Sequence, residues 1–154
     1  MRMFCDGSKG KGSIAFDLLA AFGLMSQQAQ AGVSITGSSY EEGKAQSCFN
    51  KEQCFVTMTA VPAGKTLYLY DVRCHIESKT TTPILYHAII HGNGVDTPLP
   101  TSSAKIVNGT RYTLVGEVIK KAYRAGLKPQ INVFFANGTP TFIGASCAIA
   151  GSLY

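Results

Sequence analysis

The chain has 154 residues, of which 45% are apolar and 15% are charged, and its formal net charge is +5. This length favours one domain with a sizeable core, and the charge is too mild to mark a nucleic-acid-binding protein by itself. No uncharged apolar run of about 18 residues occurs, so no transmembrane helix is predicted. Low charge, 16 glycines and many Ser and Thr residues are typical of an extracellular all-β protein.

Residues 1–31 have the order of a signal peptide: a basic start, an apolar stretch at 14–25 and an Ala-Gln-Ala cleavage signal at 29–31. The basic residues are Arg2, Lys9 and Lys11. Asp6 dilutes the basic start and Asp17 interrupts the apolar stretch, so the alternatives are an amphipathic helix packed on the domain and a misassigned start codon. The pattern predicts a short N-terminal helical leader and export, with Gly32 as the first mature residue.

Cleavage after Ala31 would leave residues 32–154, with eleven basic and seven acidic residues and a net charge of +4. It would also remove Cys5 and leave four cysteines, Cys48, Cys54, Cys74 and Cys147. An even number of cysteines in an exported chain is what a disulfide framework requires.

Residues 32–54 form a polar N-terminal segment without clear periodicity, with one short candidate strand at 33–36. Glu41 and Glu42 are adjacent in it, and we expect both to be solvated. Cys48 and Cys54 bracket five residues, which suits a local disulfide loop. The same spacing is poor for zinc, which would want tighter cysteine pairs and further ligands.

Residues 55–61 are rich in β-branched and aromatic types and predict a strand. Pro62-Ala63-Gly64 then turns the chain into a long strand at 67–76, which strict alternation divides into two faces. One face carries Tyr68, Tyr70, Val72, Cys74 and Ile76, and the other carries Leu67, Leu69, Asp71, Arg73 and His75. The charges of the second face predict a half-buried strand of an antiparallel sheet.

After a polar loop at 77–83, residues 84–91 are nearly all apolar and predict a central strand. Glycine and proline in residues 92–100 predict a long loop. Asn108-Gly109 joins strands at 104–107 and 111–119 in a predicted hairpin. Residues 120–129 are basic and predict one helical turn or a loop, and strands follow at 131–136 and 141–153.

Short, regularly spaced strands without strand–helix alternation predict an all-β fold, an antiparallel β-sandwich of jelly-roll type. In this scheme residues 55–154 form the sandwich domain, residues 32–54 precede it as the polar segment, and residues 1–31 are the leader.

The cysteines fit this scheme, because Cys74 and Cys147 both fall on the apolar faces of their predicted strands. Cys147 shares its face with Ile143, Ala145, Ile149 and Leu153. Four cysteines allow three pairings, and parity favours Cys48 with Cys54 and Cys74 with Cys147. The second bridge would close a long loop and stabilise the fold by roughly 4 kcal/mol. The alternative is that Cys74 and Cys147 are reduced core thiols.

Two short runs carry a resemblance to known proteins: Val-Pro-Ala-Gly-Lys-Thr-Leu at 61–67, which precedes a strand, and Ala-Ile-Ala-Gly-Ser-Leu-Tyr at 148–154. In these runs the chain resembles small exported bacterial β-sandwich proteins of unknown function. The resemblance covers residues 55–154 and depends on turn and strand chemistry. It implies the sandwich fold and brings no catalytic residues with it.

Sequence patterns for catalysis are weak. His87 and His91 would lie about 13 Å apart on one strand face, too far for one metal ion. No Gly-x-Ser-x-Gly elbow occurs, and the acidic residues form no evident catalytic pair. We therefore expect no catalytic residue, metal or cofactor. The enzymatic alternative is a secreted hydrolase with a loop-borne site near His87, His91 and Asp96.

Binding residues are expected in loops, since strands are committed to the core. One stretch concentrates positive charge around an aromatic ring, and its residues are Lys120, Lys121, Tyr123, Arg124 and Lys128. A second candidate loop, at residues 92–103, contains Asp96 and has His91 at its edge. These charges favour an acidic glycan or an anionic lipid surface rather than a specific nucleic acid, and the alternative is a solvated loop that serves solubility.

The sequence thus predicts an exported, disulfide-stabilised module for binding or assembly. A homo-oligomer, or a structural subunit of a surface or virion-like assembly, is a further alternative, because jelly rolls often build such structures.

Overall fold

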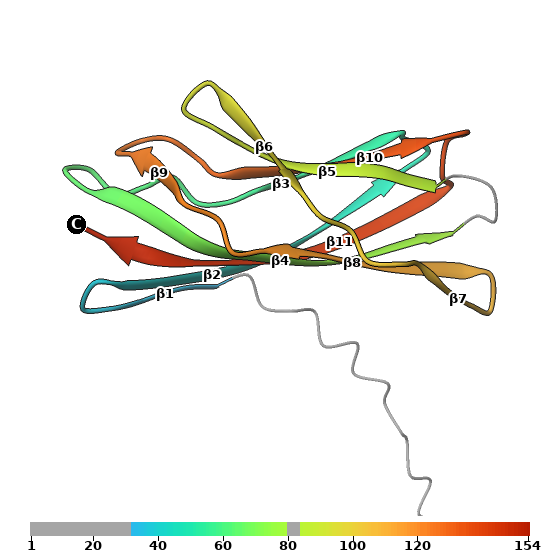
Figure 1. Cartoon of the computed structure of the whole chain (residues 1–154), viewed down its shortest axis with the longest axis horizontal. Coiled ribbons are helices and arrows are strands. Elements are labelled where there is room, and N and C mark those ends of the chain that lie inside the picture. The colour runs from blue at the N-terminus through green and yellow to red at the C-terminus, as the bar shows by residue number, and fades with distance from the viewer. Residues whose placement is uncertain (1–31, 80–83) are drawn as a thin grey trace, which may run out of the picture.

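The computed structural model describes residues 32–79 and 84–154, and within these ranges it contains eleven strands and no helix. The strands form two antiparallel sheets, stacked as two layers in a sandwich-like arrangement (Figure 1). The all-β prediction is confirmed. The predicted helical leader at 1–31 lies outside the described residues.

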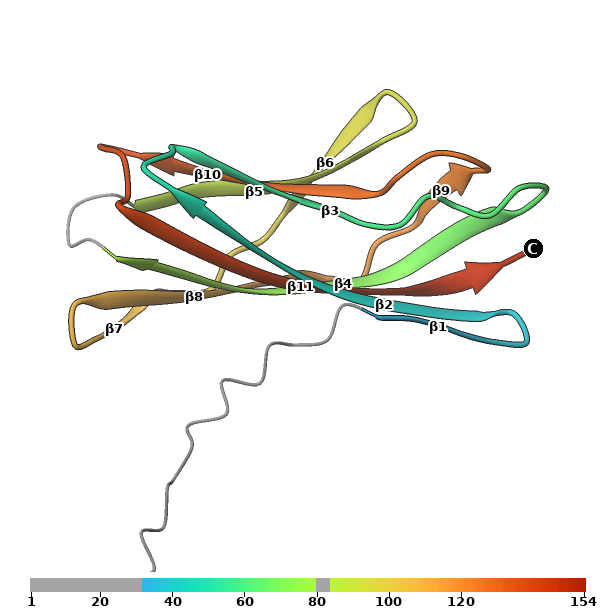
Figure 2. The ribbon, with the colours of Figure 1, turned by 180° about the vertical axis from the view of Figure 1, so that it is seen from behind.

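The larger sheet contains, in spatial order, β1 (Gly32–Thr36), β2 (Ser39–Phe49), β11 (Phe142–Leu153), β4 (Thr66–Lys79), β8 (Thr110–Glu117) and β7 (Lys105–Val107), with β9 (Lys121–Arg124) also paired to β4. The smaller sheet contains β3 (Gln53–Thr57), β10 (Gln130–Ala136), β5 (Ile84–Gly92) and β6 (Val95–Leu99). Figure 2 shows the β1–β2 hairpin along one edge of the larger sheet.

The core lies between the layers and is built by alternation along the strands. In β11 the predicted face is confirmed, because Ile143, Ala145, Cys147, Ile149 and Leu153 are all buried. The smaller sheet contributes buried side chains to the same core, from Val56, Ala88, Ile90, Ile131 and Val133. Strand β5 lies between β10 and β6, so the prediction of an interior strand at 84–91 is confirmed.

Two Asn-Gly pairs make tight hairpins. Asn108 and Gly109 have φ of 49° and 74°, and they join β7 to β8 as predicted. Asn93 and Gly94 have φ of 51° and 72°, and they join β5 to β6 in the same way. Positive φ at both positions is what two-residue hairpin turns require. The prediction of a long loop at 92–100 is therefore wrong: β6 is an edge strand, where its proline Pro98 is tolerated.

Two other stretches contain strands that the sequence did not predict, β9 and β2. Residues 121–124 form β9 rather than a helical turn or a loop. Strand β9 is four residues long and pairs with β4, and a short lysine-bearing strand of this kind is common at sheet edges. In the expected polar segment, residues 32–54, β2 pairs with both β1 and β11. The buried residues of β2 include Tyr40 and Glu42. Because one of them is a carboxylate, the sequence of β2 lacks the alternation of apolar residues by which a strand is usually predicted.

A β-bulge in β4 changes the predicted faces of that strand. Asp71 pairs with Ala150, whereas Leu69 pairs with Gly151, so Tyr70 is an extra residue on the β4 side. An extra residue reverses which side chains point inward from that position onward. Leu67 and Leu69 are consequently buried together with Val72, Cys74 and Ile76, while Tyr68 and Tyr70 are exposed. The predicted placement of both tyrosines beside Val72 is wrong for this reason.

Both predicted disulfides are present. Cys48 and Cys54 are bonded across the β2–β3 turn, with Cα atoms 5.8 Å apart. Cys74 and Cys147 are bonded between β4 and β11, and both are buried. The alternative of two reduced core thiols is wrong. Two disulfides in a β-rich domain indicate an oxidising, extracellular type of environment.

Candidate functional site

The two stretches predicted to bind ligand meet at one end of the molecule. Figure 1 shows β9 at the end of the molecule where the C-terminus lies, rising from the larger sheet toward the level of the smaller one, with the β5–β6 hairpin above it. Although β9 belongs to the larger sheet and the hairpin to the smaller one, hydrogen bonds connect them. The fold thus brings together His91, Asp96, Lys121 and Tyr123.

The ammonium group of Lys121 makes hydrogen bonds within the protein. It donates to the carbonyl oxygen of Ile90 and to Thr97 Oγ1, each at 3.1 Å, and also to the carbonyl oxygen of Val95. Burial lowers the pKa of Lys121 and the nearby Asp96 carboxylate opposes that effect, with a net lowering. Lys121 therefore clamps the hairpin of one sheet to a strand of the other.

Tyr123 is also a structural residue. Its side chain is fully buried, its hydroxyl donates to the carbonyl oxygen of His91 at 2.8 Å, and burial raises the pKa of that hydroxyl. The ring lies so close to Gly92 that a Cβ there would come within 1.9 Å of the Tyr123 ring atom Cε1. Asn93 completes the clamp by donating its side-chain amide to the carbonyl oxygen of Ala122.

The remaining predicted cations are exposed. Lys120 immediately precedes β9, and Arg124 ends it. Because Ala122 pairs with Tyr68 and Arg124 pairs with Thr66, alternation places Arg124 on the same outer face of the sheet as Ala122 and Tyr68. Lys128 is exposed in the following loop. The fold thus separates Lys120 and Arg124, which face outward, from Lys121 and Tyr123, which face the other sheet.

A pocket of about 740 Å³ opens on this outer face. Three tyrosines from β4 and from the chain end surround it, and we call it the tyrosine pocket; its lining residues are Tyr68, Leu69, Tyr70, Lys120, Lys121, Ala122, Ser152 and Tyr154. Tyr68 is 50% exposed, Tyr70 46% and Tyr154 68%. The rings of Tyr68 and Tyr154 meet nearly at right angles, with centroids 5.6 Å apart and an interplanar angle of 77°.

Local structure explains why the pocket exists. The bulge at Tyr70 turns both β4 tyrosines outward, and bulges often re-aim side chains next to functional sites. Tyr68 has small cross-strand neighbours on both sides, Ala122 in β9 and Ser152 in β11, which leave space beside its ring. Sequence analysis missed these tyrosines because strict alternation placed them in the core.

His91 and Asp96 form a close pair, with 2.5 Å between Nδ1 and Oδ1. A hydrolytic triad would also need a hydroxyl or thiol hydrogen-bonded to the histidine. Within the described ranges, Asp96 is the one hydrogen-bond partner of the His91 ring, and the Tyr123 hydroxyl donates to the main-chain carbonyl of His91 instead. Nor do three or more His, Cys, Asp or Glu side chains gather as a metal site anywhere in residues 32–79 and 84–154.

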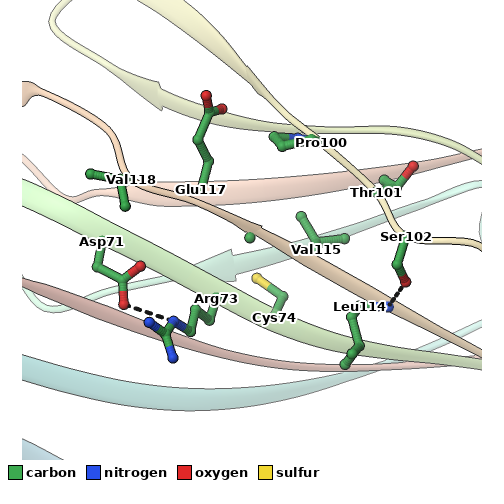
Figure 3. Close-up of a pocket in the computed structure, with 11 residues that line it drawn as sticks. Asp71, Arg73, Cys74, Pro100, Thr101, Ser102, Leu114, Val115, Glu117 and Val118 are labelled. Atoms are coloured by element: carbon green, nitrogen blue, oxygen red, sulfur yellow. Dashed lines mark hydrogen bonds and ion pairs between the residues drawn. The ribbon is translucent and has the colours of Figure 1, made fainter.

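A second pocket, of about 530 Å³, lies where residues 100–102 leave β6 and run along β8 (Figure 3). Asp71 and Arg73 pair with each other there, with 2.9 Å between Oδ2 and Nε. Ser102 Oγ accepts the amide hydrogen of Leu114 at 3.1 Å. Most polar side chains that line this second pocket are thus already paired within the protein. The tyrosine pocket is therefore the better candidate site.

The sequence analysis also missed a buried carboxylate. Glu42, expected to be solvated, is 2% exposed and accepts hydrogen bonds from Tyr40 at 2.6 Å and from the amide and hydroxyl of Thr59 at 2.8 and 2.7 Å. Lys44 Nζ lies 3.2 Å from its Oε1. Burial acts to raise the pKa of Glu42, but these donors outweigh it, and the net pKa lies below its ordinary value. This cluster connects β2 to the segment after β3.

Among the described residues, no helix has the length and apolarity needed to cross a membrane. No family model matches the chain, and no curated protein or solved structure matches it either.

Proposed function

We propose that the protein is an exported, non-catalytic binding module with a jelly-roll fold, and that it holds an anionic ligand in the tyrosine pocket. Leaving aside β1, β7 and β9, the sheets have the orders β2-β11-β4-β8 and β3-β10-β5-β6. Eight antiparallel strands wound into two four-stranded sheets in this way support the jelly roll. The resemblance to small exported bacterial β-sandwich proteins agrees with it.

Export is supported by the leader-like order of residues 1–31 and by two disulfides, which persist in oxidising compartments. The expected mature N-terminus is Gly32. The intact mass of the exported product measures this, and a product that retains Met1 would contradict it.

The observation that carries the binding proposal is the position of Lys120. It lines a pocket with three exposed tyrosines, and it has no hydrogen-bond or ion-pair partner in the part of the chain that the structure describes. Concave sites lined by aromatic side chains with a few polar groups are the usual form of ligand pockets. An unpaired cation at such a pocket favours a ligand with negative charge.

The test is binding of the oxidised full chain to an anionic polymer, such as polygalacturonate, at low and high salt. Lys120→Ser with Arg124→Ser should weaken binding, and so should salt. Lys51→Ser with Lys105→Ser removes the same charge from exposed positions outside the pocket and is the matched control. Equal loss in both double variants would indicate a general charge effect and contradict a site at the pocket.

A second candidate function is a subunit of a surface or virion-like assembly. Exposed apolar side chains on and beside β7 and β8 favour it: Ile106 is 54% exposed, Leu114 60% and Val118 76%. Exposed apolar patches often mark protein–protein contacts. Size-exclusion chromatography distinguishes the two functions, because an assembling subunit should elute with an apparent mass far above that of a single chain.

A further inference from the structure

We propose that the ligand of the tyrosine pocket is an acidic saccharide, with a sugar ring packed on Tyr68 and Tyr154 and its carboxylate paired with Lys120. This inference rests on the proposed binding function and names its ligand class.

The shape of the tyrosine pocket suits a sugar ring. A pyranose ring has apolar C–H faces and a rim of hydroxyls, so it suits an aromatic ring surface bordered by polar groups. Tyrosine supplies both, an apolar body and a polar tip. Tyr68 and Tyr154 present ring surfaces in two nearly perpendicular orientations, with centroids 5.6 Å apart. The small neighbours Ala122 and Ser152 leave room for a ring beside Tyr68.

The tyrosine pocket is also rich in hydroxyl groups. Four of the residues that line the pocket carry a side-chain hydroxyl: Tyr68, Tyr70, Ser152 and Tyr154. None of these hydroxyls has a hydrogen-bond partner within residues 32–79 and 84–154. The pocket therefore offers several unused donors and acceptors, which a polyhydroxylated ligand can satisfy and a lipid chain cannot.

The charge at the tyrosine pocket suits a ligand with isolated carboxylates. Two ammonium groups belong to lining residues, but Lys121 donates to three oxygens of the β5–β6 hairpin, which leaves Lys120 as the cation free to meet a ligand among the described lining residues. Arg124 lies further along the same face. One or two cations suit one carboxylate on each sugar unit. A nucleic-acid strand would need a track of cations along its phosphates.

The experiment uses the oxidised full chain and tetragalacturonate as the probe, with binding followed by tyrosine fluorescence, since the chain has no tryptophan. The comparison ligands are neutral galactotetraose and a short oligothymidylate. Tyr68→Ala and Lys120→Ser should each weaken tetragalacturonate binding by about tenfold or more. Tyr154→Ala is a second aromatic variant, in case Tyr68→Ala does not fold.

Phe49→Ala is the matched control, because it removes an exposed ring that packs on Phe142 and does not line the pocket. It should leave the affinity unchanged.

Four outcomes would overturn the inference, and they separate it from the proposed function. If tetragalacturonate binding depends on Lys120 but not on either tyrosine, the pocket is a simple anion site and only the saccharide inference fails. Equal binding of galactotetraose would remove the acidic requirement. Tighter binding of oligothymidylate, with the same tyrosine dependence, would indicate a nucleic-acid site. If no anion binds at all, the proposed function fails with the inference.

Discussion

Cys74 and Cys147 lie directly opposite each other on β4 and β11, with their Cα atoms 4.0 Å apart and both side chains buried. Their disulfide joins two neighbouring strands inside the larger sheet rather than the two layers. It connects residues 73 positions apart in sequence, whereas the Cys48–Cys54 bond spans six positions.

The two disulfides should differ in their contribution to stability. In the chain-entropy account, a bond stabilises by constraining the unfolded chain, and the long loop gives about 4 kcal/mol against about 2 kcal/mol for the short one. Replacing Cys74 and Cys147 together by Ala should therefore lower the free energy of unfolding more than replacing Cys48 and Cys54. Urea unfolding of the two double variants measures this. An equal loss would show that loop length does not set the difference.

Glu42→Gln should destabilise the fold by about 3 kcal/mol at neutral pH, because it removes a buried carboxylate from its donors Tyr40, Thr59 and Lys44. Glu41→Gln is the matched control, since Glu41 is exposed, and it should change stability by less than about 0.5 kcal/mol. Similar effects of the two substitutions would mean that Glu42 does not act as a buried anion.

The same residue predicts a pH dependence with a definite sign. The pKa of Glu42 is lowered in the folded state, so its contribution is fully present above the ordinary carboxyl pKa. That contribution is lost as the pH falls through the folded-state pKa. Unfolding free energies measured from neutral pH to about pH 3 should fall less steeply in Glu42→Gln than in the unchanged chain. Parallel pH profiles would contradict the assignment.

Gly151→Ala should disturb the bulge that exposes Tyr68. A Cβ at Gly151 would lie 2.5 Å from the carbonyl oxygen of Tyr68 and 2.9 Å from Leu67 Cδ1, so the backbone must shift. Gly43→Ala is the matched control in β2, where a Cβ would come no closer than 4.0 Å to another atom. We expect a loss of about 2 kcal/mol for Gly151→Ala only, measured by thermal unfolding. An unchanged melting temperature would show that the bulge adapts freely.

Lys121→Met should loosen the clamp between β9 and the β5–β6 hairpin, because three acceptors lose their donor. We expect a loss of about 2 kcal/mol, against less than about 0.5 kcal/mol for Lys120→Met at the exposed neighbouring position. Hydrogen exchange at the amides of β6 should also accelerate in Lys121→Met alone. No difference between the two variants would contradict the structural role of Lys121.

Much of the fold could be predicted from the sequence because local signals agreed with tertiary structure. Alternation identified the inward face of β11, and it placed Cys74 and Cys147 on the core side of their strands. Asn108-Gly109 marked its hairpin, and cysteine parity selected the observed pairing.

The features that the sequence did not predict have separate physical causes. The bulge at Tyr70 is set by how β4 meets β11, which no local pattern reports. Strand β6 was predicted as a loop partly because it contains Pro98, but an edge strand tolerates proline. Glu42 was expected to be solvated. It is buried because Tyr40 and Thr59 donate hydrogen bonds to it, and Thr59 lies in a segment distant in sequence. Of the predicted site residues, Lys120 and Lys121 line the tyrosine pocket, whereas the tyrosines that also line it depend on the bulge for their outward orientation.

The proposed ligand site on the outer face of the larger sheet depends on both the bulge and Lys120. The most direct measurement is an NMR titration of the isotopically labelled, oxidised chain with tetragalacturonate. A ligand in the tyrosine pocket should perturb chiefly the backbone amides of Tyr68, Tyr70, Lys120, Ser152 and Tyr154. Perturbations centred on His91 and Asp96, or spread evenly over the surface, would contradict it.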